Sequence, residues 1–259
     1  MKKIGLALGG GGARGVAHIA YLMAMDEMGI RPCVISGTSS GAIAGAMYAG
    51  GMSPADMLSI LHNLFDGKNK KNGLHSKICK IPSAIVASVV RKELSDLLPK
   101  PSFEQLDIPL SIVATNFHTL QEHIFDRGEI IPALMASIAF PNTFAPQQVD
   151  GEYYMDGGAT NIVPFDIIRG SCDILIAIDV SQVRPVKLNP TAKNAAHATW
   201  AATQEALISY KLDSCRVDLF ERPTFDENIS TMDFQKYDRV YSQAQRFIPD
   251  FISKLNKLI

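Results

Sequence analysis

The feature that most constrains the fold is the segment 37–41, which reads Gly-Thr-Ser-Ser-Gly. It follows a short apolar run at 33–36 and precedes 42–47, a run of small and apolar residues typical of a closely packed helix. A sharp strand-to-helix turn with serine at its apex is the pattern of a nucleophile elbow. Side chains two residues on either side of that serine would collide, and we expect the two glycines to relieve the collision. The pattern predicts that the hydroxyl of Ser39 is exposed above a helix N-terminus, where developing negative charge is stabilised.

A second glycine-rich turn lies near the N-terminus. Residues 4–8 form an apolar run that predicts a buried strand, and residues 9–15 follow as Gly-Gly-Gly-Gly-Ala-Arg-Gly. A helix is expected next, over 16–28. Consecutive glycines let the backbone adopt positive φ and turn successive N–H groups toward a ligand. Such a set of amides at a helix N-terminus binds an anion, either a phosphate or the oxyanion of a tetrahedral intermediate.

Other interpretations of this glycine loop explain less. Gly10, Gly12 and Gly15 match the dinucleotide-binding fingerprint, but the second expected strand ends in Ser-Gly and not in the acidic residue that the fingerprint requires. A P-loop needs a lysine after the glycines, and none follows; a tight connection with no ligand is the remaining alternative. An oxyanion hole explains both glycine turns together, because adjacent parallel strands bring them to the same sheet edge, where open α/β sheets bind ligands.

The sequence offers no compelling histidine as the base that a serine nucleophile needs. Of the histidines, the ones that follow Ser39 are His62, His75, His118, His123 and His197. Only His197 comes late enough for the order serine, acid, histidine, but residues 194–200 are typical of a helix interior. His18 lies in the first expected helix, where a hydrogen-bonded core side chain is the more common case.

Asp156 is a better candidate base. It ends a short strand that pairs, in an expected hairpin, with residues 147–149. Gly157 and Gly158 would let the backbone turn away and leave the carboxylate in a crowded site, although a plain Asp-Gly turn is the alternative. Burial in a dry pocket disfavours the charged carboxylate and makes it a better proton acceptor. The sequence therefore allows a Ser39–Asp156 dyad without histidine.

Four motifs in this order resemble those of the patatin-like phospholipases, in the form of a single bacterial-type patatin domain. They are residues 9–15, 37–41 and 156–158, and the block Ala-Ser-Ile-Ala-Phe-Pro at 136–141 with Phe144 nearby. The resemblance covers roughly residues 4–180. It implies an α/β fold of three layers, α/β/α, with a mostly parallel central sheet, similar to the catalytic domains of cytosolic phospholipase A2. The alternation of expected strands and helices along the chain agrees with that class.

The resemblance also implies roles for individual residues. Ser39 is then the nucleophile and Asp156 the general base, and the oxyanion hole is formed by amides of Gly10, Gly11 and Gly12, with the last two favoured. The supporting motif positions are Gly9, Arg14, Gly15, Gly37, Gly41, Gly157 and Gly158, and His18 falls at a position with a packing role. Arg14 is expected to brace the glycine loop or to meet substrate charge.

The implied activity is that of a serine acyl-hydrolase acting on acyl esters of lipids, of phospholipase or lysophospholipase type. Neither a metal nor a cofactor is expected, because hydrogen-bond donors supply the electrostatic stabilisation. Transfer of the acyl group to an alcohol is the enzymatic alternative, and a non-catalytic lipid-binding protein is the alternative from another class. A formal net charge of −1 argues against a general nucleic-acid binder.

At 259 residues the chain is expected to form a single α/β domain over 1–259, with a catalytic core at 4–180 and a helical extension at 181–259 packed on that core. Other expected elements are helices at 53–65, 130–139 and 236–258, the last kinked or broken at Pro249, and strands at 109–116, 123–125 and 174–179. Four cysteines without metal or redox spacing, and a start without a signal-peptide pattern, favour a cytoplasmic protein.

Residues 67–90 are the candidate element for peripheral contact with a membrane. The stretch 67–80 holds five lysines and no acidic residue, and 81–90 places apolar residues at helical spacing. A basic loop beside an amphipathic helix suits an anionic membrane surface or a lid. A solvated loop that leads into a core-packed helix is the more common arrangement and is favoured here.

Overall fold

The computed structural model describes residues 2–65, 83–141, 143–181, 191–225, 229–230 and 233–259. Within them one mixed sheet has the strand order β5-β6-β3-β2-β1-β7-β8, with β4 beside β3. The strands are β1 (Ile4–Leu8), β2 (Val34–Thr38), β3 (Leu110–Asn116), β4 (Glu122–Phe125), β5 (Gln147–Val149), β6 (Glu152–Asp156), β7 (Ile174–Ile178) and β8 (Leu219–Glu221). Strands β3, β2, β1, β7 and β8 are parallel to one another. Strands β4, β5 and β6 are antiparallel to their neighbours. The expected mostly parallel sheet is confirmed.

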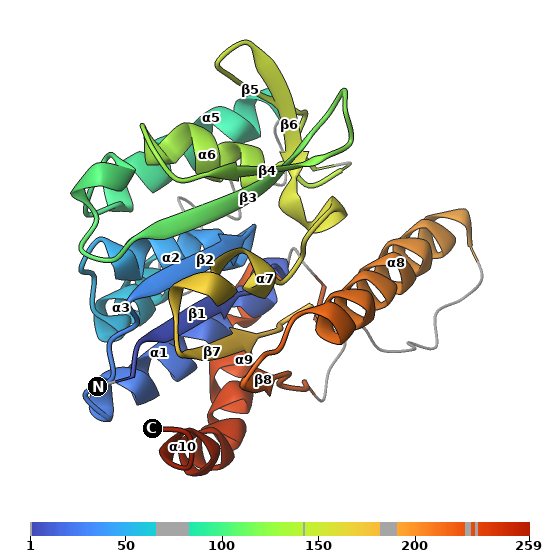
Figure 1. The fold of residues 1–259 in the computed structure, drawn as a ribbon. Helices are drawn as coiled ribbons and strands as arrows, with labels where there is room; N and C mark the ends of the chain where they lie inside the picture. The colour runs from blue at the N-terminus through green and yellow to red at the C-terminus, as the bar shows by residue number, and fades with distance from the viewer. Residues whose placement is uncertain (1, 66–82, 142, 182–190, 226–228, 231–232) are drawn as a thin grey trace.

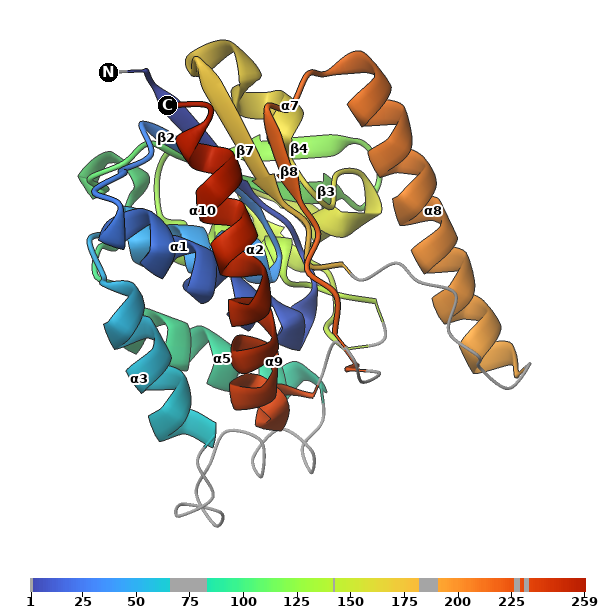
Figure 2. The same cartoon turned by 90° about the horizontal axis from the view of Figure 1, so that it is seen from below.

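Helices cover both faces of this sheet, as Figures 1 and 2 show. They are α1 (Ala17–Glu27), α2 (Ser40–Ala49), α3 (Pro54–Phe65), α5 (Ser83–Leu97), α6 (Ile130–Ser137), α7 (Phe165–Ile168), α8 (Ala192–Ser214), α9 (Tyr237–Ala244) and α10 (Ile248–Asn256). The short 3-10 helices used below are η1 (Gly12–Val16), η4 (Gly157–Ala159) and η7 (Gln245–Phe247). Most helices lie on the face of α1 and α2, whereas α7 and α8 lie on the other.

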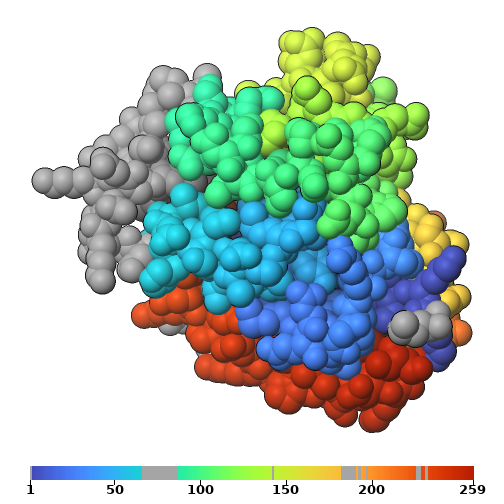
Figure 3. All heavy atoms as spheres, turned by 90° about the vertical axis from the view of Figure 1, so that its left-hand side faces the viewer, coloured from blue at the N-terminus to red at the C-terminus, as the bar shows by residue number. Residues whose placement is uncertain are grey.

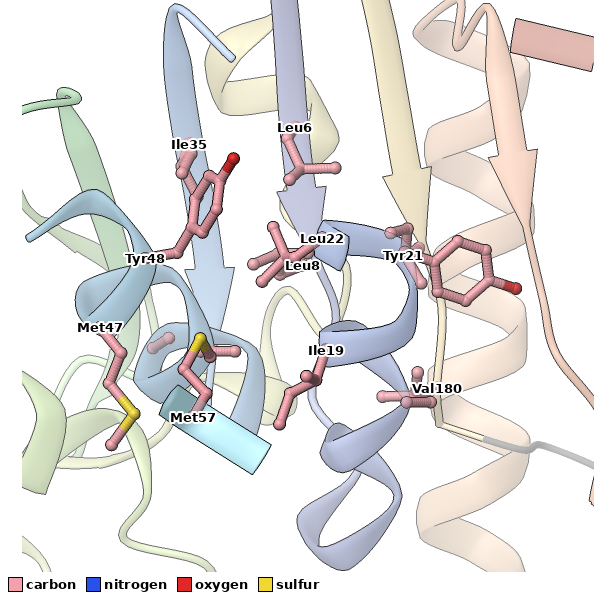
Figure 4. Packing of buried hydrophobic residues seen from close by; sticks show 14 of the residues in the cluster. Leu6, Leu8, Ile19, Tyr21, Leu22, Ile35, Met47, Tyr48, Met57 and Val180 are labelled. Atoms are coloured by element: carbon pink, nitrogen blue, oxygen red, sulfur yellow. The ribbon is translucent and has the colours of Figure 1, made fainter. Parts of the chain in front are cut away.

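The alternation of side chains along β1 explains the two helical layers. Leu6 and Leu8 belong to the large apolar cluster that contains α1, while Ala7 between them belongs to the cluster with Phe165 of α7. Figure 4 shows Leu8 beside Leu22 of α1. Because every residue of β1 is buried, both faces of the central strand need a helical cover. The three-layer α/β/α class is therefore confirmed.

The C-terminal segment is broken near Pro249, which is one of the two forms expected for it. The expected helix at 236–258 is broken into α9, η7 and α10, with Pro249 in the first turn of α10. Phe251 of α10 is fully buried, and its ring meets that of Tyr21 of α1 edge to face at 5.0 Å. Residues of α1 (blue) and of the C-terminal helices (red) lie side by side in Figure 3. The extension at 181–259 is also not purely helical, because it contributes β8 to the sheet.

Residues 66–82, which include most of the candidate membrane element at 67–90, lie outside the described residues. Helix α5 runs to Leu97, beyond the expected end at 90, and Val90 and Leu94 pack against the main apolar cluster. No helix in the described part of the chain is both long enough and apolar enough to cross a membrane. The described cysteines, Cys33, Cys172 and Cys215, form no disulfide.

The pairing of β3 brings two distant strand ends together. Strand β2 runs alongside β3 as far as Thr38, which pairs with Val113. Strand β6 comes from the opposite direction and ends at Asp156, which pairs with Ala114, the next residue of β3. Since β4 occupies the other edge of β3 over the same residues, β2 and β6 must meet end to end. Their last residues form the centre of the site described next.

Candidate active site

Ser39 lies at the apex of the β2–α2 turn in a strained backbone conformation, with φ 53° and ψ −120°. Non-glycine residues rarely adopt positive φ, and such strain concentrates at functional sites. The amide of Ser39 donates to Oγ of the buried Ser137, at the end of α6, at 2.8 Å. This bond holds the apex of the turn against a neighbouring element.

The two glycines of the turn are required for different reasons. A Cβ at Gly37 would lie 2.7 Å from Cα of Ala42, which is the expected collision within the turn. A Cβ at Gly41 would lie 2.1 Å from the carbonyl oxygen of Leu8. The second glycine therefore lets α2 approach β1.

The hydroxyl of Ser39 donates to Oδ2 of Asp156 at 2.9 Å. Asp156 is 2% exposed, and its Oδ1 accepts from the amide of Gly158 at 2.7 Å. Burial raises the pKa of the Asp156 carboxyl to about 6, against the opposing effect of the hydrogen bonds from Gly158 and Ser39. A serine hydroxyl thus faces a carboxylate that is poised to accept a proton near neutral pH.

The glycines after Asp156 allow close packing and not an unusual φ. Neither Gly157 nor Gly158 has a positive φ. A Cβ at Gly157 would lie 2.3 Å from the carbonyl oxygen of Val113, so any side chain there would push β6 away from β3. The chain turns into η4 directly after Asp156, and Gly157 makes the close approach to β3 possible at that turn.

The first two amides of the glycine loop tie it to the sheet edge. Gly9 donates to the carbonyl of Ile178, and Gly10 donates to that of Ile162, both at 2.9 Å. A Cβ at Gly10 would lie 3.2 Å from Cβ of Ser39, so the loop passes directly beside the serine. Because the amide of Gly10 is already engaged, it is not free to meet an oxyanion.

The next two amides of the loop make no bond to another backbone group within the described residues. The amide of Gly11 donates to Oγ of Ser40 at 3.0 Å. Gly12 has φ 59°, and its N–H finds no acceptor within the described residues. A Cβ at Gly15 would lie 2.5 Å from Oγ of Ser40, which explains why glycine is needed there. The Ser40 hydroxyl therefore links the glycine loop to the first turn of α2.

Arg14 braces this loop from the side of β7. Its guanidinium donates to the carbonyls of Val180 at 2.9 Å, Ser181 at 2.7 Å and Ile229 at 2.7 Å. Burial lowers the pKa of Arg14 to about 10, with the Asp179 carboxylate acting in the opposite direction. All three of these bonds run to backbone, which is the arrangement expected of a brace.

No histidine in the described part of the chain hydrogen-bonds to Ser39 or Asp156. His18 is fully buried and places Nε2 2.8 Å from the carbonyl oxygen of Gly9, as a core side chain beneath the glycine loop. Burial lowers the pKa of His18 to about 4, so its ring is neutral. His75 and the side chain of His197 lie outside the described residues.

Three contacts at the site were missed by sequence reasoning. Ser40 and Ser137 lie within motifs that were recognised, but neither hydroxyl was assigned a partner. Gln204 of α8 donates from Nε2 to the carbonyl of Gly158, 46 residues away. No local sequence pattern predicts such a contact, because it depends on how α8 packs against the turn after Asp156. The described residues contain no cluster of three or more His, Cys, Asp or Glu that could hold a metal ion.

The fold and this geometry define an α/β protein with a serine at a strand-to-helix turn beside a buried carboxylate. The sequence model of the family described as Patatin-like phospholipase matches residues 6–169. The chain belongs to the patatin-like phospholipase family, as its motifs indicated.

Several relatives are similar in sequence. An uncharacterized NTE family protein of Mycobacterium tuberculosis is 34% identical over 188 residues, which cover 69% of this chain and 49% of the relative. The lysophospholipase NTE1 of Pyricularia oryzae is 25% identical, covering 98% of this chain and 19% of the relative. Patatin-like phospholipase domain-containing protein 6 of Homo sapiens is 26% identical, covering 94% and 20%. The chain thus spans about half or less of the length of these relatives.

Among solved structures, VipD of Legionella pneumophila is similar with a TM-score of 0.49 and 15% sequence identity, over 96% of this chain and 67% of that chain.

Proposed function

We propose that the protein is a serine acyl-hydrolase that cleaves acyl esters of lipids with a Ser39–Asp156 dyad. The observation that carries the proposal is the 2.9 Å hydrogen bond from Ser39 Oγ to the buried carboxylate of Asp156. A nucleophile within hydrogen-bond reach of a base of suitable pKa is what this chemistry requires. Membership in a family named for phospholipases, and a relative named lysophospholipase, support a lipid ester as the substrate.

In the proposed reaction, Asp156 takes the hydroxyl proton as Ser39 Oγ attacks the ester carbonyl. The negative charge on the tetrahedral oxygen is met by the amides of Gly11 and Gly12, and the first of these gives up its bond to the rotatable Ser40 hydroxyl to do so. Collapse breaks the ester C–O bond, and the leaving alcohol takes the proton from Asp156. Water, deprotonated by Asp156, then attacks the acyl-Ser39 ester; the bond between the acyl carbon and Ser39 Oγ breaks, Asp156 returns the proton to Ser39 Oγ, and the fatty acid leaves.

Residues 4–180 are proposed as the catalytic core, on which the C-terminal segment packs. The acyl-enzyme would also react with an alcohol, so transacylation is the alternative outcome at the same dyad. Peripheral membrane contact through 67–90 in a cytoplasmic setting is the alternative to the solvated loop favoured for this segment, and its support is the five lysines at 67–80.

Hydrolysis of a short-chain chromogenic ester and of a lysophospholipid tests the proposal. Ser39→Ala is expected to abolish turnover, and Asp156→Asn to lower kcat by at least about 1000-fold, because a weakly basic amide replaces the base. Both variants should unfold cooperatively. Substantial activity in Asp156→Asn together with loss of activity in His197→Ala would replace the dyad with a triad. A folded wild-type protein that hydrolyses neither ester would favour a non-catalytic lipid-binding role.

A further inference from the structure

Helix α8 lies beyond the residues that the family model matches, yet it closes over the turn that follows Asp156. Gln204 is 2% exposed, and its side-chain amide donates to the carbonyl of Gly158. A Cβ at Gly158 would lie 3.4 Å from Cζ2 of Trp200, so the indole rests on the same glycine. Phe140 meets Trp200 edge to face at 5.4 Å. Helix α8 thus reaches the site through two residues one helical turn apart. In Figure 1 this helix (orange) extends away from the sheet.

This contact continues to the carboxylate. Gly158 accepts from Gln204 through its carbonyl, and its own amide donates to Oδ1 of Asp156 at 2.7 Å. Fixing the carbonyl of Gly158 restricts rotation of the turn η4 and so keeps the amide aimed at the carboxylate. The remaining oxygen of Asp156, Oδ2, is then left to face Ser39.

In the part of the chain that the structure describes, only the donor half of the Gln204 amide is paired. Its Oε1 is buried and has no partner within the described residues. The neighbouring position on the same face of α8, Ile208, is apolar and buried. An apolar side chain at 204 would remove the unpaired Oε1 but leave the carbonyl of Gly158 without the donor that Gln204 gives it. The engaged part of this buried amide is therefore its N–H donor, which holds the carbonyl of Gly158.

We propose that Gln204 is a positioning residue for Asp156, acting through the Gly158 turn, so that α8 is part of the active site although it lies outside the family-matched segment. The proposal rests on the proposed function, since it assigns Asp156 the role of base. Lys211 of α8, bonded to Asp166 at 2.7 Å, helps to keep the helix in place.

The test is Gln204→Leu, which keeps the volume and removes the donor. With a soluble chromogenic ester we expect kcat to fall about tenfold or more at unchanged KM, because misplacement of a base acts on the chemical step. The acid limb of kcat/KM should move to higher pH, because the bond from Gly158 that lowers the pKa of Asp156 is weakened. Wild-type kcat with an unmoved acid limb in Gln204→Leu would overturn the proposal.

Ile208→Ala is the matched control, because it loosens the same face of α8 without touching the Gly158 bond. Ile208→Ala should lower Tm and leave the acid limb of kcat/KM at its wild-type pH. An equal shift of the acid limb in both variants would mean that Gln204 only helps to pack α8, and would overturn the proposal. Hydrogen exchange over residues 156–160 gives a readout that does not depend on turnover. Faster exchange in Gln204→Leu than in Ile208→Ala is expected. Equal exchange in the two variants would show that Gln204 does not hold the Gly158 turn. This result stands even if the wild-type protein is inactive and the proposed function fails.

Discussion

At the scale of single residues, the environment of Asp156 decides what the site can do. Two hydrogen bonds stabilise its charged form, whereas almost complete burial disfavours that form. Burial is the larger effect, and the pKa of the carboxyl is raised to about 6. An ordinary aspartate would be a much weaker base, while a still higher pKa would leave it protonated in neutral solution.

The pH dependence of the reaction follows from that pKa. The proposed base is active only when it is ionised, so kcat/KM should fall as pH drops through about 6, tenfold for each further unit. A pH profile with a soluble ester, recorded from pH 4.5 to 8.5, measures this limb. Activity that stays constant down to pH 4.5 would show that Asp156 does not take the proton.

Most residues of the candidate site could be predicted from the sequence, because each motif is a short contiguous segment. Tight turns are predicted by the glycines on both sides of Ser39 and by the pair of glycines after Asp156. What such patterns do not reveal is the use of each amide. Gly10 donates to Ile162, a partner far along the chain, and only the folded structure shows that this amide is engaged.

At the scale of elements, the strands and helices with strong periodicity were predicted well, and the weakly patterned ones were not. Strand β1 and helix α3 lie where the sequence placed them, to within a residue. Strand β8 was missed because it has three residues and includes a charged one, Glu221, so that neither alternation nor apolar character marks it. The break at η7 precedes Pro249, whose fixed φ suits the first turn of a new helix.

The packing of α10 on α1 gives a prediction about stability. Phe251 is fully buried against Tyr21, so Phe251→Ala leaves a large cavity between the two helices. The free energy of unfolding should fall by about 3–5 kcal/mol, as for other buried aromatic truncations. Urea unfolding measures the change, and kcat per folded molecule should be unaltered because α10 does not touch the site. A loss below about 1 kcal/mol would mean that α10 contributes little to the fold.

At the scale of the whole molecule, the site exists because distant segments meet at one sheet edge. Ser39 and Asp156 are 117 residues apart and are joined by the end-to-end meeting of β2 and β6 on β3. The order of the motifs indicated that they belong together, but the sequence could not show this pairing or the approach of α8. Both depend on contacts between elements, and the sequence of an element does not indicate which other element it contacts.

The buried carboxylate should also affect global stability. Its pKa in the folded protein is about 6, above the ordinary value of 3.8, so the folded state binds the proton more tightly and loses stability as pH rises from about 4 through 6. The difference of about two units corresponds to roughly 3 kcal/mol. Asp156→Asn removes this titration, so its stability advantage over wild type should be small near pH 4 and reach its full size above pH 7. Urea unfolding at both pH values checks this, and an equal offset at the two would contradict it.

The most direct test of the central claim is labelling with a lipid-like fluorophosphonate, followed by intact-mass measurement and peptide mapping, in wild type and in Asp156→Asn. The account predicts one adduct on the wild-type protein, located at Ser39, and none on the folded Asp156→Asn variant in the same time. An adduct on Ser39 that forms equally fast in both proteins would show that Asp156 is not the base. A folded wild-type protein that forms no adduct would contradict an activated serine.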